Sequence, residues 1–191
     1  MGHKICVICA RDDDCDHRND CQKRPSLNVG SGLMLKKECI NLDVKSHSHR
    51  GRSTDVIGDI NNVDKIFEEG QFDSVLAFHV LEHFRKGQMQ EILGKLRYVL
   101  RVGGKLIVET PDLIGMYKLY WERHKDIVKL EAAIYGGEAQ IYGEAGWHRS
   151  GWTQETMAEE MEKAGFEIVH KGIGISHGMG MRDLRVEGVK K

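Results

Sequence analysis

After residue 25, apolar runs of strand length alternate with segments of helical periodicity, and this alternation restricts the folds open to the chain. The runs read SLNVG, CINLDV, TDVIGDI, FDSVLAFHV, GGKLIVET, FEIVHKGI and RDLRVEGV. They are rich in Val, Ile and Leu, as buried strands are. The pattern predicts an α/β fold in which helices flank a mostly parallel sheet. Only a Gly-rich loop separates the last two runs, so we expect an antiparallel pair at the sheet edge.

Helices are predicted between these runs. VDKIFEEG is a short one, and KGQMQEILGKLRYVLR carries apolar residues at helical spacing and should end at Gly103-Gly104. A longer helical stretch, capped by Asp112, should run to Gly136-Gly137. Thr153 is expected to cap a further helix that ends at Gly165.

Length and charge narrow the class of protein. The chain has 191 residues, enough for one domain with a sizeable core. Lys and Arg total 28 against 29 Asp and Glu, so no basic excess favours nucleic acid as a partner. No apolar run reaches the roughly 18 residues of a membrane span. The N-terminal segment MGHKICVICARDDD does not match a secretion signal, because its apolar run is too short and acidic residues follow it. We expect a cytoplasmic protein without a membrane partner.

The chain divides into a Cys-rich N-terminal extension, residues 1–25, and a body, residues 26–191. Four of the five cysteines lie in the extension: Cys6, Cys9, Cys15 and Cys21. Four thiolates can hold a structural zinc ion, but only the first pair has the usual C-x-x-C spacing. Two interpretations stay open, a small zinc site or free thiols. The odd number of cysteines and the cytoplasmic expectation disfavour disulfides.

The turn Gly30-Ser31-Gly32 follows the first strand directly, where open parallel sheets bind ligands. Glycines there expose backbone N–H groups to a ligand. Asp43 ends the second run, and its carboxylate can accept hydrogen bonds from both hydroxyls of a ribose. A dinucleotide site would carry G-x-G-x-x-G opening a full helix, but the third glycine is missing and LMLKKE is short. S-adenosylmethionine, a ribose-bearing ligand without phosphate, fits better than NAD; the alternative is a plain tight turn.

The ordered set of motifs resembles the class I S-adenosylmethionine-dependent methyltransferases, in the type 11-like subgroup with a short first helix. The resemblance covers roughly residues 26–170 and is carried by LNVGSG, INLDV, DVIGDI, FDSVLAFHVLEHF, LRYVLRVGGKLIVETPD and HRSGWTQETMAEEMEKAGFEIV. It implies a Rossmann-like three-layer sandwich, with a seven-stranded, mostly parallel sheet and an antiparallel edge strand. It also implies an enzyme that methylates O, N or C of an acceptor. Two departures are Asn28, where many members carry an acid, and the nearly absent first helix.

The resemblance assigns roles to single residues. Gly30, Ser31 and Gly32 would line the methionine and ribose, and Asp43 would hold the ribose hydroxyls. Asp59 matches the family acid that binds the adenine amine. The predicted cofactor-binding set is Asn28, Gly30, Ser31, Gly32, Asp43, Asp59, Ile60, Phe78 and His79.

Two segments offer catalytic and acceptor-binding groups. His79, at the end of the fourth strand, is a candidate general base or a structural histidine. GEAGWHRSGW could contact a planar or anionic acceptor, or could fold back into the core. The catalytic candidates are His79 and His148, and the acceptor-binding candidates are Glu82, Tyr142, Trp147, His148 and Arg149.

The charge balance and compact chain favour a small-molecule or sugar-type acceptor. Two other functions remain open at this point. One is an NAD-dependent oxidoreductase of similar layout. The other is a non-catalytic binding or scaffold protein with a methyltransferase fold.

Overall fold

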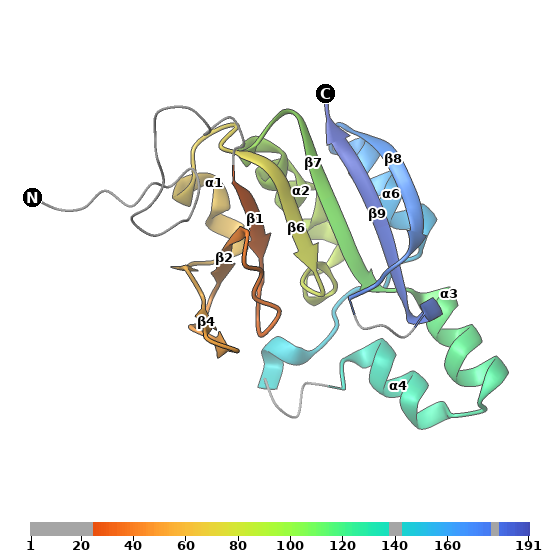
Figure 1. Cartoon of the computed structure of the whole chain (residues 1–191). Coiled ribbons are helices and arrows are strands. Elements are labelled where there is room, and N and C mark those ends of the chain that lie inside the picture. The colour runs from red at the N-terminus through yellow and green to blue at the C-terminus, as the bar shows by residue number, and fades with distance from the viewer. Residues whose placement is uncertain (1–24, 138–142, 177–179) are drawn as a thin grey trace, which may run out of the picture.

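The computed structural model describes residues 25–137, 143–176 and 180–191. The predictions for Tyr142 and for the four N-terminal cysteines, Cys6, Cys9, Cys15 and Cys21, fall outside these ranges. The body is an α/β structure built on one main sheet (Figure 1).

The main sheet has seven strands in the order β5-β2-β1-β6-β7-β9-β8. Their bounds are β1 Ser26–Val29, β2 Cys39–Asp43, β5 Val56–Ile57, β6 Phe72–Phe78, β7 Leu100–Pro111, β8 Phe166–Ile173 and β9 Asp183–Lys190. The first five strands in this order run parallel, whereas β9 is antiparallel to both β7 and β8. The predicted mostly parallel sheet with an antiparallel pair at its edge is therefore confirmed.

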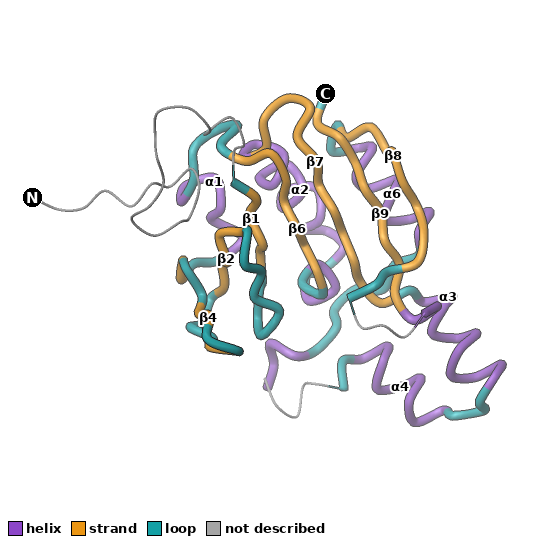
Figure 2. Tube along the Cα trace, in the orientation of Figure 1, coloured by secondary structure: helices purple, strands orange, loops and turns teal. Residues whose placement is uncertain are grey.

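Helices flank the sheet in two places (Figure 2). Helices α1 (Val63–Ile66), α2 (Met89–Val99) and α6 (Gln154–Lys163) lie on one face, where alternate strand residues are fully buried. Helices α3 (Leu113–Met116) and α4 (Ile127–Tyr135) lie beyond the carboxyl ends of the parallel strands. Among the described residues, no helix combines the length and apolarity needed to cross a membrane.

The core lies between the sheet and α2 with α6. Leu106, Val108 and Val186 of the sheet pack in one cluster with Leu93 and Leu96 of α2, and all five side chains are fully buried. The apolar spacing of α2 explains this contact, because residues three and four apart share one face of a helix. The core therefore holds the central strands rigidly, and their carboxyl ends provide a fixed platform for a site.

Two predicted helix ends differ from the structure. Helix α2 stops at Val99, and Gly103, with φ of 74°, bends the start of β7 where its pairing with β6 is irregular. The predicted helix from Asp112 to Gly136-Gly137 is interrupted. A π-helical segment continues α3, Lys125 takes a φ of 54°, and α4 starts anew after Asp126.

A small hairpin was not predicted. Strands β3 (Ser48–His49) and β4 (Arg52–Ser53) pair antiparallel across Arg50-Gly51. Arg50 and Gly51 have φ of 50° and 74°, as the tightest hairpin turns require. The surrounding sequence is polar and gave no strand pattern.

The predicted cap of α6 allows a direct test. Thr153 Oγ1 accepts a hydrogen bond from the Thr156 N–H at 3.2 Å, and Thr156 Oγ1 accepts one from the Thr153 N–H at 2.9 Å. Thr153→Ala removes one half of this capping box and is expected to lower the free energy of unfolding by about 1 kcal/mol in urea denaturation. Thr153→Ser should retain most of that stability. Equal losses in the two variants would contradict the capping role.

Candidate functional site

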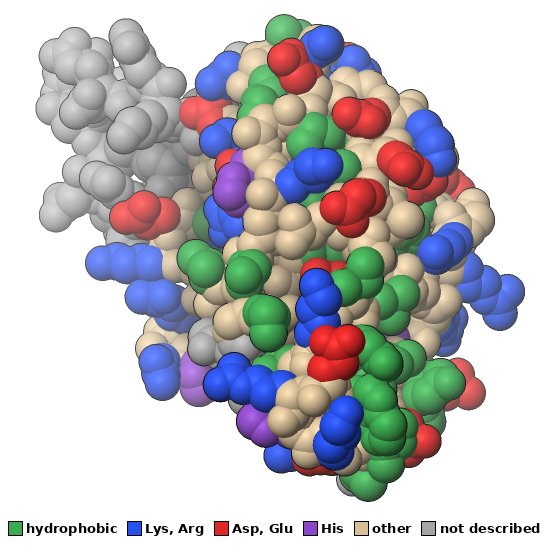
Figure 3. Space-filling model, turned by 90° about the vertical axis from the view of Figure 1, so that its right-hand side faces the viewer, with side chains coloured by type: hydrophobic (Ala, Val, Ile, Leu, Met, Phe, Trp, Pro, Cys, Tyr) green, Lys and Arg blue, Asp and Glu red, His purple; other side chains and the backbone are tan. Residues whose placement is uncertain are grey.

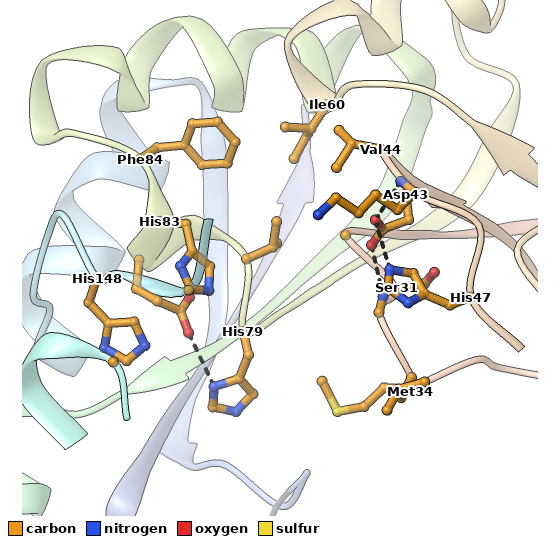
Figure 4. Close-up of a pocket in the computed structure, with 18 of the residues that line it drawn as sticks. Ser31, Met34, Asp43, Val44, His47, Ile60, His79, His83, Phe84 and His148 are labelled. Carbon is orange, nitrogen blue, oxygen red and sulfur yellow. Dashed lines mark hydrogen bonds and ion pairs between the residues drawn. The ribbon is translucent and has the colours of Figure 1, made fainter. Parts of the chain in front are cut away.

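A pocket of about 470 Å³ opens at the carboxyl ends of β1, β2, β5 and β6. Its wall comes from the turn after β1, the ends of β2 and β5, the segment after β6, the C-terminal part of α4 with the two glycines after it, and the segment 144–149. Figure 4 shows two groups that face each other across it: Ser31, Met34, Asp43 and His47 on one side, and His79, His83 and His148 on the other. We call these sides the glycine-turn end and the histidine end.

The glycine turn is fixed by steric and hydrogen-bond requirements. Gly30 and Gly32 have φ of 60° and 47°, a region that side chains disfavour. A Cβ on Gly30 would lie 2.3 Å from Val80 Cγ2, whereas one on Gly32 would meet nothing within 4 Å. Ser31 Oγ is buried and has no hydrogen-bond partner in the part of the chain that the structure describes. The turn thus presents open space beside Gly32 and a hydroxyl available to a ligand.

Asp43 is held at the end of β2 and faces this turn. Its Oδ2 accepts a hydrogen bond from the Gly32 N–H at 2.9 Å, and its Oδ1 accepts one from the Lys45 N–H at 3.1 Å. His47 Nε2 lies 3.3 Å from Oδ1. The Asp43 side chain is 12% exposed and lines the pocket. A carboxylate has about four acceptor sites, so it can accept further hydrogen bonds from a ligand there. His47 was not predicted, since a histidine in a polar loop has no distinguishing pattern.

Asp59 and Ile60 follow β5 and complete the glycine-turn end. Asp59 Oδ1 accepts hydrogen bonds from Asn61 N at 2.8 Å and Asn61 Nδ2 at 2.9 Å, which caps a short 3₁₀ turn. Ile60 is buried and lines the pocket. Both predicted residues thus line the pocket.

His79 is held in a strained backbone conformation after β6. Its φ is 51°, uncommon for a residue with a side chain, and its N–H donates to Glu109 O at 2.8 Å. The ring is fixed on both sides: Nδ1 lies 3.2 Å from Glu82 Oε1, and Nε2 lies 3.0 Å from Ser176 Oγ. The imidazole therefore has a defined orientation at the pocket wall.

His79 and Glu82 form a buried ion pair. Burial by itself lowers the pKa of His79, but the hydrogen bond and charge of Glu82 outweigh this effect and raise the pKa above its ordinary value. Burial would raise the pKa of Glu82, yet the hydrogen bond and charge of His79 lower that pKa to about 2. Near neutral pH, Glu82 is a carboxylate, and the pair favours a protonated His79.

The segment after α4 folds over Glu82. The backbone N–H groups of Arg149 and Ser150 both donate to Glu82 O, at 2.7 and 3.1 Å. His83 and His148 stack edge to face with ring centroids 5.2 Å apart. Burial lowers the pKa of the His148 imidazole, which favours its neutral form. The fold thus joins two distant motifs, LEHF and GWHRS, at the histidine end.

Most predicted site residues line the pocket: Gly30, Ser31, Gly32, Asp43, Asp59, Ile60, His79, Glu82, His148 and Arg149. Three described residues from the predicted set do not. Asn28 donates instead to Asn41 Oδ1 at 3.0 Å, in a polar network between β1 and β2. Phe78 is buried, with Lys36 over its ring, and the Trp147 side chain is half exposed outside the lining.

Arg182 and His83 line the pocket in addition to the predicted set. Arg182 lies in the Gly-rich loop before β9, and no motif in that loop separates it from other charged loop residues. His83 stands beside Glu82 in the sequence, but its role depends on contact with His148, which only the tertiary fold creates.

Open α/β sheets bind their ligands in a crevice beyond the carboxyl ends of the strands, and the pocket lies at that place. Residues 12–171 match the family described as methyltransferase domain, which is more than half of the chain. The chain therefore belongs to this family, and it is an S-adenosylmethionine-dependent methyltransferase. A comparison with the curated proteins finds no match.

Solved structures support the same fold. A SAM-dependent methyltransferase from Archaeoglobus fulgidus is 16% identical, with a TM-score of 0.59 over 88% of this chain and 87% of that one. One from Methanosarcina mazei is 15% identical, with a TM-score of 0.60 over 86% and 91% of the two chains. The 1,6-didemethyltoxoflavin-N1-methyltransferase of Burkholderia thailandensis, solved with S-adenosylhomocysteine, is 16% identical, with a TM-score of 0.58 over 87% and 70%.

Proposed function

We propose that the pocket binds S-adenosylmethionine at its glycine-turn end and a small-molecule acceptor at its histidine end. The arrangement in Figure 4 carries this proposal, because a turn and carboxylate suited to a nucleoside face a separate group of imidazoles across one cavity. The two substrates of a transfer reaction must meet in one pocket with their reacting atoms in line.

The glycine-turn end fits the cofactor in three respects. Open space beside Gly32 admits a ligand close to the backbone, and the unpartnered Ser31 hydroxyl can donate to it. The Asp43 carboxylate, already oriented by backbone N–H groups, would accept hydrogen bonds from the ribose hydroxyls. We assign the adenine to the surroundings of Asp59 and Ile60.

Methyl transfer from this cofactor requires few catalytic groups from the protein. S-adenosylmethionine supplies, when bound, a methyl group already activated by a sulfonium centre. The residues of this chain then align the acceptor and exclude water. His148 lies across the cavity from the glycine turn, and Arg149 lines the cavity beside it, so the segment 144–149 is suited to both tasks.

The two predicted catalytic histidines differ in what their rings can do. Both nitrogens of His79 are engaged, with Glu82 and with Ser176, so we propose that His79 shapes the pocket wall. His148 uses Nδ1 to bond Ile134 O at 3.2 Å, and its second nitrogen is left for a ligand at the histidine end. His148 is therefore the better candidate for contact with the acceptor.

The size and charge of the site favour a small acceptor, such as a sugar-type metabolite. A cavity of about 470 Å³ must hold both the cofactor and the reacting part of the acceptor. On the face shown in Figure 3, basic and acidic side chains are intermixed, with no wide basic surface for a polyanion. The structurally similar methyltransferase of Burkholderia thailandensis was solved with a small molecule bound, 1,6-didemethyltoxoflavin.

An NAD-dependent oxidoreductase is less consistent with this pocket. In the described part of the chain, no helix follows the glycine turn between β1 and β2. The helix N-terminus that binds a pyrophosphate in dinucleotide sites is therefore missing from that position. A non-catalytic scaffold role does not account for the oriented Asp43 carboxylate or for the buried His79–Glu82 pair at the pocket wall.

A transfer assay with a labelled methyl group tests the proposal. The full chain is incubated with methyl-labelled S-adenosylmethionine and, separately, with a metabolite extract, total RNA and a protein mixture. We expect label only in the small-molecule fraction, and none with Asp43→Ala. Label confined to RNA or protein, or no transfer at all, would contradict the proposed acceptor class.

A further inference from the structure

We propose that Glu82, His83 and His148 form a binding site for a divalent transition-metal ion at the histidine end of the pocket. One carboxylate oxygen of Glu82 and one nitrogen of each imidazole lie within 4.8 Å of one another. All three side chains also line the cavity. Figure 4 shows both imidazoles on the same side of it, next to His79.

Only a modest closure would bring these atoms to binding distance. A cation about 2.1 Å from each ligand holds neighbouring ligand atoms roughly 3 to 3.5 Å apart. Atoms that lie within 4.8 Å of one another need to approach by less than about 2 Å to reach this spacing, which side-chain rotations can supply. His83 and His148 are only half-buried, so their rings have room to turn.

The hydrogen bonds of the two imidazoles orient them as metal ligands. His83 Nδ1 lies 3.1 Å from Trp147 O, and His148 Nδ1 lies 3.2 Å from Ile134 O. A carbonyl oxygen can only accept, so each Nδ1 carries the proton and each Nε2 keeps its lone pair in the neutral ring. Histidine ligands of metals are usually fixed in this way, by a backbone carbonyl on the second nitrogen.

Glu82 supplies independent support for a cation. The residue is 1% exposed, and its Oε1 is bound to His79. Its Oε2 is buried and has no hydrogen-bond partner among the residues that the structure describes. A buried carboxylate oxygen without a partner costs free energy, and a metal ion in contact with it would remove that cost.

The donor set indicates the type of metal. Two imidazoles with one carboxylate suit Zn²⁺, Fe²⁺ or Co²⁺, whereas Mg²⁺ and Ca²⁺ prefer oxygen ligands throughout. Three protein ligands leave coordination positions open toward the cavity. Those positions suit an oxygen ligand, either water or a hydroxyl of the acceptor. The cation would then orient that hydroxyl, and His148 would act on the acceptor through the cation instead of by direct contact. None of its three ligands belongs to the zinc site predicted from the sequence at Cys6, Cys9, Cys15 and Cys21.

Cobalt binding tests the site without cofactor or acceptor, so its failure would leave the proposed methyl transfer intact. The full chain carrying serine at Cys6, Cys9, Cys15 and Cys21 is freed of metal and titrated with Co²⁺, and the visible absorption of the bound ion is followed. We expect one Co²⁺ per chain. His83→Gln and His148→Gln should each weaken binding more than about tenfold, because each removes a ligand.

His170→Gln is the matched control, since His170 is exposed on β8 and does not line the pocket. It should bind Co²⁺ like the parent. Circular dichroism of the metal-free variants shows whether they fold, and His83→Gln decides the question if His148→Gln does not. Absence of Co²⁺ binding by the serine variant, or equal binding by the folded His83→Gln protein, would overturn the proposal.

Discussion

Asp43→Ala is expected to lower the affinity for S-adenosylmethionine by about 100- to 1,000-fold. In the proposed binding mode, the Asp43 carboxylate accepts hydrogen bonds from two ribose hydroxyls, each contributing about 1.5 to 2 kcal/mol because the acceptor is charged. Every 1.4 kcal/mol corresponds to about tenfold in the dissociation constant. The substitution also removes the acceptor of the Gly32 N–H, which loosens the turn itself. Equilibrium binding to purified protein measures the change.

Two controls separate ligand contact from turn geometry. Asp43→Asn keeps one oxygen for the Gly32 N–H but loses the charge and one acceptor, so we expect an intermediate loss of affinity. Glu131→Ala removes an exposed acid on α4 outside the pocket lining and should change nothing. An Asp43→Ala protein that binds within about threefold of the parent would show that the ribose lies elsewhere.

Glu109→Ala is expected to lower the free energy of unfolding by about 3 to 5 kcal/mol, because it breaks a buried ion pair. Glu109 on β7 is fully buried and accepts hydrogen bonds from Arg185 Nη1 at 2.8 Å and from the Ser176 N–H at 2.9 Å. The substitution leaves the Ile175 and Ser176 N–H groups without their acceptor, and it removes one of the two carboxylates paired with Arg185, the other being Glu187. Urea denaturation measures the loss.

The double variant Glu109→Leu/Arg185→Met is the informative control for this pair. Replacing both charges by apolar side chains should cost much less than Glu109→Ala, because the cavity is filled and Glu187, which loses Arg185, keeps its ion pair with Lys105. A double variant as unstable as Glu109→Ala would show that packing, not charge, accounts for the loss.

The same ion pair predicts how stability depends on pH. Burial raises the pKa of Glu109, but the hydrogen bonds from Ser176 and Arg185 outweigh it, so the folded pKa lies below the ordinary value. The stabilisation is therefore present above the unfolded pKa of about 4.3 and is lost as the pH falls through the folded pKa. In Glu109→Gln this part of the acid destabilisation should vanish. An unchanged pH profile would contradict the assignment.

The sheet could be predicted because its signals are local. Runs such as FDSVLAF and GGKLIVET are long and apolar, and the Thr153 cap lies next to the helix that it starts. The break at Lys125 could not be predicted, since Asp126 restarts the helix without a glycine or proline to mark it. The predicted helix end at Gly103-Gly104 was also wrong, because a glycine pair can bend a strand as well as end a helix.

The two ends of the pocket also differed in how far the sequence predicted them. Gly32 lies in the turn after β1, and Asp43 ends the neighbouring strand β2, so the order of the strands predicted that both lie at the same edge of the sheet. His83 and His148 are distant in sequence, and the backbone bonds from residues 149 and 150 to Glu82 O bring them together. Asn28 was predicted to bind the cofactor because of its place beside the turn. Its side-chain NH₂ group instead donates to Met34 O and Asn41 Oδ1.

Titration calorimetry of the full chain with S-adenosylhomocysteine, and in parallel with NADH, tests the central claim most directly. The account predicts micromolar binding of S-adenosylhomocysteine at one site per chain and no heat with NADH, because the turn lacks the helix that a pyrophosphate needs. Binding of NADH with none of S-adenosylhomocysteine would contradict it.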